Sequence, residues 1–140
     1  MPVLMTPVAA MPVPVVVSAY RSPSCGCCKG WLEHLRKAGF TVKDYVTSDL
    51  ASVKQRYGVP SLLQSCHTAR IGGYTVEGHI PVSTIQRLLK ERPQVAGIAV
   101  PGMPLGSPGM ESPSKKESYT VFTFTESGRT QAFQTVKGDG

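Results

Sequence analysis

The sequence lacks any apolar run near the roughly 20 residues that a membrane-spanning helix needs. Acidic residues are also few, nine against fifteen Lys and Arg, which leaves a net charge of +6. These basic residues are scattered, without a basic run or the interleaved aromatic residues of single-strand binders. Phosphate-binding glycine patterns and nucleophilic serine motifs are missing as well. We therefore predict neither a membrane span nor a nucleic-acid partner.

Cysteine is scarce too, with four residues in the chain, too few for a disulfide framework. Three of them, Cys25, Cys27 and Cys28, lie within four positions, and the fourth is Cys66. Cys25 and Cys28 have the spacing of a redox dithiol, whereas the adjacent Cys27 and Cys28 are poorly placed to bridge each other. This clustering predicts metal or redox chemistry. A set of inert, buried cysteines is the less favoured alternative.

The N-terminal residues 1–17 are apolar but carry no basic segment. Prolines at 2, 7, 12 and 14 would also break the helix of a signal peptide, so no export signal is recognisable. We predict a flexible lead-in over 1–12, one domain over 13–136 and a flexible tail over 137–140. Within the domain, the Gly-, Pro- and Met-containing stretch 93–117 is predicted to be a loop.

Hydrophobic periodicity predicts an α/β fold. Helices are expected from Cys25 to Gly39, from Ser48 or Asp49 to Tyr57, and from Pro81 to Pro93. Strands are expected over 13–20, 40–46, 67–71 and 74–77, followed by a C-terminal β-hairpin over 119–125 and 129–136. The order β-α-β-α-β-β-α matches the thioredoxin-like topology, a mixed sheet with helices on both faces. Several α/β folds share fragments of this order.

The Cys25-Gly26-Cys27-Cys28 segment follows a predicted strand and opens a predicted helix. Free amides and the dipole at a helix start favour the thiolate form of Cys25. Cys28 shares a helical face with Trp31 and should point inward, while Cys27 lies about 100° around the helix. Three thiols exceed what a dithiol oxidoreductase requires, and the extra one favours a metal.

The predicted topology also brings Cys66 and His67 to this cluster. A third strand antiparallel to the first begins beside the end of the first strand, where the first helix starts. A buried cysteine next to a surface histidine is the alternative. Strand 74–77 returns to the same end, so His79 is a candidate ligand or supporting residue, with a plain turn histidine as an equal alternative. His34 is about 10 Å along the helix from Cys27 and is left out.

Met103 and Met110 each end a Pro-Gly-Met triplet in the predicted loop. Thioether and thiolate sulfur together select Cu(I) over harder divalent ions. Core packing is the commoner role of a single methionine and stays open for both. A structural zinc site ranks well behind, because it usually shows two separated CxxC or HxxxH pairs.

Together these motifs resemble the CopG-type copper-resistance family, in the segments 20–31, 65–68, 73–74 with 77–81, and 100–104 with 106–111. The resemblance extends from about residue 15 to 135. It implies a thioredoxin-like fold, a periplasmic location and Cu(I) held by Cys25, Cys27, Cys28 and Cys66, as a thiolate-bridged multi-copper cluster. Roles for His67, His79, Met103 and Met110 are less defined by the resemblance.

We therefore predict a Cu(I)-binding protein for copper tolerance or trafficking, with copper ions and other periplasmic copper-handling proteins as its partners. The alternative is a thiol-disulfide or copper oxidoreductase with Cys25 as nucleophile and Cys28 as resolving thiol. The two can coexist, because oxidation of the dithiol would eject the metal. Whether the protein turns over a substrate is left open.

Overall fold

The computed structural model describes residues 15–139. The elements in chain order are β1 (Val16–Arg21), α1 (Gly26–Lys37), β2 (Thr41–Val46), α2 (Leu50–Arg56), the 3-10 helix η1 (Ser61–Leu63), β3 (His67–Ile71), β4 (Tyr74–Glu77), α3 (Val82–Glu91), β5 (Gly97–Ala99), β6 (Tyr119–Phe124) and β7 (Thr130–Val136). The predicted order β-α-β-α-β-β-α is confirmed. The predicted lead-in, 1–12, lies outside the described residues.

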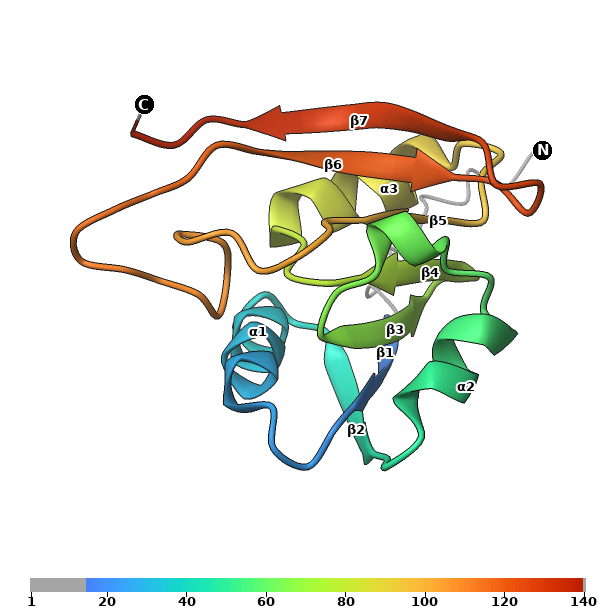
Figure 1. Ribbon diagram of the computed structural model, residues 1–140, viewed down its shortest axis with the longest axis horizontal. Helices are drawn as coiled ribbons and strands as arrows, with labels where there is room; N and C mark the ends of the chain where they lie inside the picture. Colours follow the sequence, from blue (N-terminus) through green and yellow to red (C-terminus); the bar gives the residue numbers. More distant parts are fainter. Residues whose placement is uncertain (1–14, 140) are drawn as a thin grey trace, which may run out of the picture.

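The seven strands form one mixed sheet in the order β2-β1-β3-β4-β5-β6-β7, which Figure 1 shows between the helices. Strand β1 is parallel to β2 and antiparallel to β3, with Arg21 opposite His67. The start of β3 therefore lies beside the end of β1, as the predicted topology requires. This pairing brings the residue before β3, Cys66, to the end of the sheet where α1 begins.

One strand was not predicted. Within the expected loop 93–117, Gly97, Ile98 and Ala99 form β5, parallel to β4 and antiparallel to β6. The C-terminal hairpin of β6 and β7 is thereby part of the main sheet. Three residues are too few to show an alternating pattern. Gly97 fits because a Cβ there would overlap the carbonyl oxygen of Thr75 on β4.

Helices cover both faces of the sheet, as predicted. On one face Trp31 and Leu35 of α1 and Leu88 of α3 join the core with strand residues such as Ile71. Each such fully buried aliphatic side chain contributes roughly 1.5–3 kcal/mol of burial free energy. Helix α2 covers the other face, and none of the helices in residues 15–139 is long and apolar enough to span a membrane.

Local signals set several boundaries where the sequence predicts them. Asp49 is the N-cap of α2 and accepts a hydrogen bond from the backbone amide of Ser52 at 3.3 Å. Gly72 and Gly73 form the β3–β4 turn with φ of 57° and 89°, values that non-glycine residues rarely adopt. This tight turn sends β4 back toward the end of the sheet that carries Cys66.

Candidate metal centre

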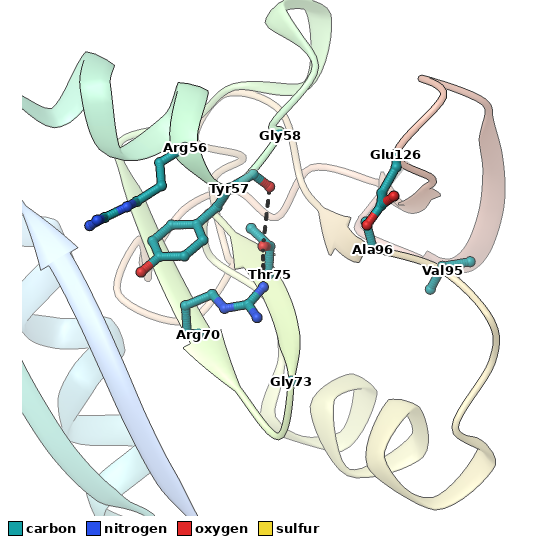
Figure 2. Close-up of a pocket in the computed structure, with 9 residues that line it drawn as sticks. All are labelled: Arg56, Tyr57, Gly58, Arg70, Gly73, Thr75, Val95, Ala96 and Glu126. Atoms are coloured by element: carbon teal, nitrogen blue, oxygen red, sulfur yellow. Dashed lines mark hydrogen bonds between the residues drawn. The ribbon is translucent and has the colours of Figure 1, made fainter.

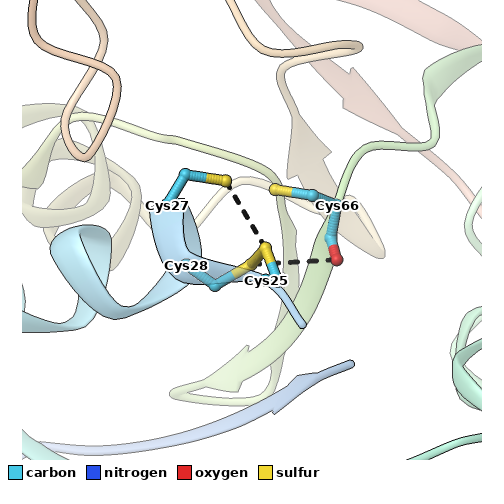
Figure 3. A group of neighbouring side chains, drawn as sticks. All are labelled: Cys25, Cys27, Cys28 and Cys66. Atoms are coloured by element: carbon cyan, nitrogen blue, oxygen red, sulfur yellow. Dashed lines mark hydrogen bonds between the residues drawn. A yellow bond between two sulfur atoms is a disulfide. The ribbon is translucent and has the colours of Figure 1, made fainter. Parts of the chain in front are cut away.

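The four cysteine sulfurs meet at one end of the sheet, as Figure 3 shows. Cys25 is the N-cap of α1, Cys27 and Cys28 lie in its first turn, and Cys66 directly precedes β3. All four Sγ atoms lie within 4.8 Å of one another. Cys28 is 1% exposed and faces the core, whereas Cys27 and Cys66 are half-buried. The structure thus places four sulfur donors from two distant segments in a single cluster.

A disulfide joins Cys25 to Cys28, whose Cα atoms are 5.5 Å apart. Cys27 and Cys66 are free, and the Sγ of Cys27 lies 3.4 Å from the Sγ of Cys25. The bond that the dithiol spacing predicts is therefore compatible with this backbone. Because the thiolate is the form that binds metal, reduction of this bond adds two sulfur ligands to the cluster.

His67 points one ring nitrogen into the cluster. Its Nε2 lies 2.7 Å from the carbonyl oxygen of Gly78, which can only accept, so Nε2 carries the proton. The unprotonated Nδ1 lies 3.2 Å from Cys28 Sγ and 3.3 Å from Cys66 Sγ. Burial is the main cause that lowers the pKa of His67 to about 3, so the ring is neutral near pH 7. The unprotonated Nδ1 of a neutral imidazole has a lone pair that can bind a metal ion.

His79 is oriented in the same way from the end of β4. Its Nδ1 donates to the carbonyl oxygen of Pro108 at 2.6 Å, and its Nε2 faces Cys66 Sγ at 3.0 Å. Burial is the largest cause that lowers the pKa of His79, and burial likewise raises the pKa of the Cys66 thiol to about 12. The donor atoms of Cys66, His67 and His79 all lie within 4.8 Å of one another.

The two Pro-Gly-Met triplets occupy different positions. The Sδ of Met103 lies 3.7 Å from Cys27 Sγ, on a side chain that is 49% exposed. In the second triplet the backbone makes the contacts, since Pro108 binds His79 and Gly109 packs against the first turn of α1. Among residues 15–139, no hydrogen bond links the Met110 side chain to the cluster. Its role as a ligand stays a prediction.

The loop that carries these triplets is tied to α1 at the surface. Glu111 accepts a hydrogen bond from the Gly109 amide at 2.8 Å. Its other carboxylate oxygen lies 3.3 Å from the Nε2 of His34, the histidine left out of the predicted site. The pKa of Glu111 is lowered, because these hydrogen bonds outweigh its partial burial. His34 therefore supports the loop from outside the cluster.

The sequence did not predict a buried ion pair between Lys54 and Glu77, close to Cys66. Glu77 is fully buried and accepts hydrogen bonds from Lys54 Nζ, Thr68 Oγ1 and the amide of Ser65, the last at 2.8 Å. Burial is the main cause that raises the pKa of Glu77, and the neighbouring ammonium of Lys54 opposes it. The pair fixes the backbone next to Cys66. Its only sequence signal is a charged residue at an inward position of α2 and of β4.

A separate cavity of about 460 Å³ lies near the β3–β4 turn, and Figure 2 shows the residues that line it. Arg70 donates to Thr75 Oγ1 at 2.9 Å and stacks over the ring of Tyr57. The lining residues are Arg56, Tyr57, Gly58, Arg70, Gly73, Thr75, Val95, Ala96 and Glu126. None of them offers sulfur or imidazole, so the candidate metal centre lies elsewhere, at the cysteine cluster.

The similarities to known proteins include the segments that form the candidate metal centre. Residues 63–110, which include Cys66 and His79, match a family described as protein of unknown function, DUF411. Two solved structures, forms 2 and 1 of the copper resistance protein CopG, are 44% identical to the chain. They have TM-scores of 0.85 and 0.84, cover 89% of this chain, and are themselves covered to 100% and 98%. No curated protein matches the chain.

Proposed function

Because the chain belongs to the CopG family of copper-resistance proteins, we propose that it binds Cu(I) for copper tolerance or trafficking. The family and the cysteine cluster support copper-related metal binding. The observation that carries the choice of Cu(I) is the meeting of four cysteine sulfurs within 4.8 Å. Soft thiolate ligands select Cu(I) over harder divalent ions.

The proposed ligands are the thiolates of Cys25, Cys27, Cys28 and Cys66. Four sulfurs in one cluster, each able to bridge two ions, favour a multi-copper cluster. His67 and His79 add neutral imidazole nitrogens, oriented toward sulfur by carbonyl oxygens on their far sides. Met103 adds a thioether next to Cys27, and Met110 is a further proposed ligand.

We also propose a periplasmic location with other periplasmic copper-handling proteins as partners. The family is named for copper resistance, and this role supports a location outside the cytoplasm. Fractionation of cells that express the full-length gene tests this proposal, and a purely cytosolic pool contradicts it.

Anaerobic titration of the reduced protein with Cu(I), followed by native mass spectrometry and thiol counting on the same sample, tests the function. We expect more than one copper per chain and displacement of Zn(II) by Cu(I). The matched control is the same protein with the Cys25–Cys28 disulfide intact, which should bind less Cu(I) because two thiolates are missing. Zinc retained against excess Cu(I) contradicts the copper proposal.

The disulfide favours a second candidate, a thiol-disulfide oxidoreductase. In this reaction the Cys25 thiolate of the reduced protein attacks a substrate disulfide, and one substrate thiolate leaves. The Cys28 thiolate then attacks Cys25, which releases the second substrate thiolate and forms the Cys25–Cys28 disulfide; an external dithiol reduces this bond and is itself oxidised to a disulfide. Cys25 is half-buried and Cys28 almost fully buried, which suits these two roles. Fast turnover of a disulfide substrate by metal-free protein, abolished in Cys25→Ser, would place this activity first. Slow turnover beside tight Cu(I) binding leaves copper binding as the function.

A further inference from the structure

The cavity near the β3–β4 turn lies at the opposite end of β3 from Cys66. Cys66 directly precedes this strand, whereas Gly73 lies in the turn that follows it and lines the cavity. The five residues of β3 span about 17 Å at the usual rise per residue. The cavity is therefore separate from the cysteine cluster. Its volume of about 460 Å³ is typical of small-molecule sites, which measure roughly 300–1,000 Å³.

Arg70 brings a positive charge to one wall of this cavity. Its guanidinium stacks over the ring of Tyr57, with Cζ 4.9 Å from the ring centroid, and donates to Thr75 Oγ1 at 2.9 Å. The Thr75 hydroxyl in turn donates to the carbonyl oxygen of Tyr57 at 3.3 Å, as Figure 2 shows. Thr75 is fully buried, so this chain of contacts fixes the orientation of the half-buried guanidinium.

The Arg70 guanidinium has no acidic partner within residues 15–139. No carboxylate there is close enough to form an ion pair with it, and Thr75 is its one hydrogen-bond acceptor. Charged groups that are removed from water are normally paired. The planar fork of a guanidinium matches a carboxylate, which it binds through two parallel hydrogen bonds. Arg70 is thus oriented to receive a carboxylate from another molecule.

The opposite wall of the cavity carries a negative charge. Glu126, in the β6–β7 turn, lines the cavity together with Ala96, and Figure 2 shows both across the cavity from Arg70. The Glu126 carboxylate is exposed and makes no ion pair in the part of the chain that the structure describes. Val95 and Ala96 add an apolar surface to this wall. The arrangement fits a small molecule that has a carboxylate, an ammonium and an apolar body.

We propose that this cavity binds a small zwitterion, with its carboxylate at Arg70 and its ammonium at Glu126. Free amino acids and short peptides share this chemistry. Arg70 alone would accept any small anion, whereas the carboxylate of Glu126 attracts an ammonium and repels a second negative charge on the ligand. The site uses no cysteine or histidine, so the inference does not rest on the proposed copper function.

Isothermal titration calorimetry of the full-length protein with alanine and with alanyl-alanine tests the proposal. We expect one molecule per chain and a dissociation constant of about 1 mM or tighter for at least one of the two probes. The tighter probe shows whether the cavity takes a single amino acid or a peptide. Alanyl-alanine amide, which lacks the carboxylate, should bind at least about 10-fold more weakly than alanyl-alanine. N-acetyl-alanyl-alanine, which lacks the ammonium, should bind about 2- to 5-fold more weakly.

Three variants assign the two charges. Arg70→Gln should weaken binding at least about 10-fold, because the hydrogen bonds between a guanidinium and a carboxylate are charge-assisted. Glu126→Gln should weaken binding about 2- to 5-fold, since an exposed charge contributes little, and should remove the difference between alanyl-alanine and its N-acetyl form. Arg56→Gln is the matched control. It removes the same charge from the same cavity, but the Arg56 guanidinium points away from the other lining residues in Figure 2, so binding should fall less than about 2-fold.

Two-dimensional amide NMR spectra locate the bound probe and show whether each variant is folded. The amides of Gly58, Gly73 and Ala96, which line the cavity, should shift on titration. The indole N–H of Trp31, which donates to a carbonyl oxygen in the core, should not shift. If Arg70→Gln fails to fold, the comparison of alanyl-alanine with its amide on the wild-type protein decides.

Three results would overturn the inference. The first is the absence of both a calorimetric signal and cavity shifts with either probe up to about 10 mM. The second is equal binding of alanyl-alanine and its N-acetyl form by the wild-type protein, because this would indicate a site for anions in general. The third is an equal loss of binding in Arg56→Gln and Arg70→Gln, which would show that positive charge alone attracts the probe.

Discussion

The imidazole of His79 donates its Nδ1 proton to the carbonyl oxygen of Pro108, 2.6 Å away, although 29 residues separate them in the sequence. This bond leaves Nε2 as the nitrogen that faces Cys66 at 3.0 Å. The second Pro-Gly-Met triplet therefore contacts the candidate metal centre through its backbone. The next residue, Gly109, extends this contact to the first turn of α1.

The first prediction concerns Gly109, which has a φ of +90°. A Cβ at this position would come within 2.6 Å of Cys27 O and 3.0 Å of His79 Nδ1, so Gly109→Ala forces the loop away from α1. We expect a loss of several kcal/mol in the free energy of unfolding, beyond the ~1–3 kcal/mol of backbone strain alone. We also expect Cu(I) affinity to fall at least about 10-fold, because His79 loses its orientation.

Gly128→Ala is the matched control, since Gly128 has a φ of +88° but open space where its Cβ would lie. It should lose stability through backbone strain alone and keep its Cu(I) affinity. Urea unfolding and competition with a chromophoric Cu(I) chelator measure the two effects. Equal behaviour of both variants in both assays would show that Gly109 does not position His79.

Cys66→Ser should lower the Cu(I) stoichiometry as severely as Cys27→Ser, although the two cysteines are far apart in the sequence. The physical reason is that all four sulfurs lie within 4.8 Å of one another, so each supplies one of the four proposed thiolate ligands. Native mass spectrometry of the reduced variants gives the copper count. If Cys66→Ser still binds the full number of copper ions while Cys27→Ser does not, the Cys66 thiol is buried without binding copper.

Met103→Leu and Met110→Leu should differ in Cu(I) binding. The Met103 thioether is 3.7 Å from Cys27 Sγ, so its loss should weaken Cu(I) binding several-fold with little change in stability, since the side chain is half exposed. Met110→Leu should have the smaller effect if the second triplet acts through its backbone. Chelator competition on both reduced variants measures this, and an equal loss in both would establish Met110 as a ligand.

The buried His67 should make the metal-free protein lose stability in acid. Its folded-state pKa of about 3 lies below the usual 6.5, so the unfolded chain takes up a proton first as the pH falls through 6.5. The free energy of unfolding should therefore decline from about pH 6.5 toward pH 3, with a slope of up to about 1.4 kcal/mol per pH unit from this group. Above pH 6.5 the group has no effect.

His67→Gln isolates this contribution, because glutamine does not titrate. Urea unfolding at several pH values between 7 and 4.5 should give a flatter curve for His67→Gln than for wild type. Gly128→Ala, which removes no titratable group, should keep the wild-type slope. If His67→Gln and wild type show parallel curves, then His67 is not held neutral by burial.

Much of the fold could be predicted because it depends on short-range patterns. The helical spacing of Cys28 and Trp31, the Asp49 cap and the Gly72-Gly73 turn each act over a few residues, and each is visible in the sequence. The order of the elements then places the start of β3 beside the start of α1. The approach of Cys66 to the CxCC segment follows from that order.

The donor types and the order of the elements could thus be predicted, since residue identity and periodicity are local properties. Tertiary structure alone decided which imidazole nitrogen faces sulfur, because the deciding partners are the backbone carbonyls of Gly78 and Pro108, which every residue type presents. It also decided that Met103 contacts Cys27 and that Lys54 pairs with Glu77. These contacts join segments far apart in the chain, and their geometry exists only once the sheet and its loops have packed.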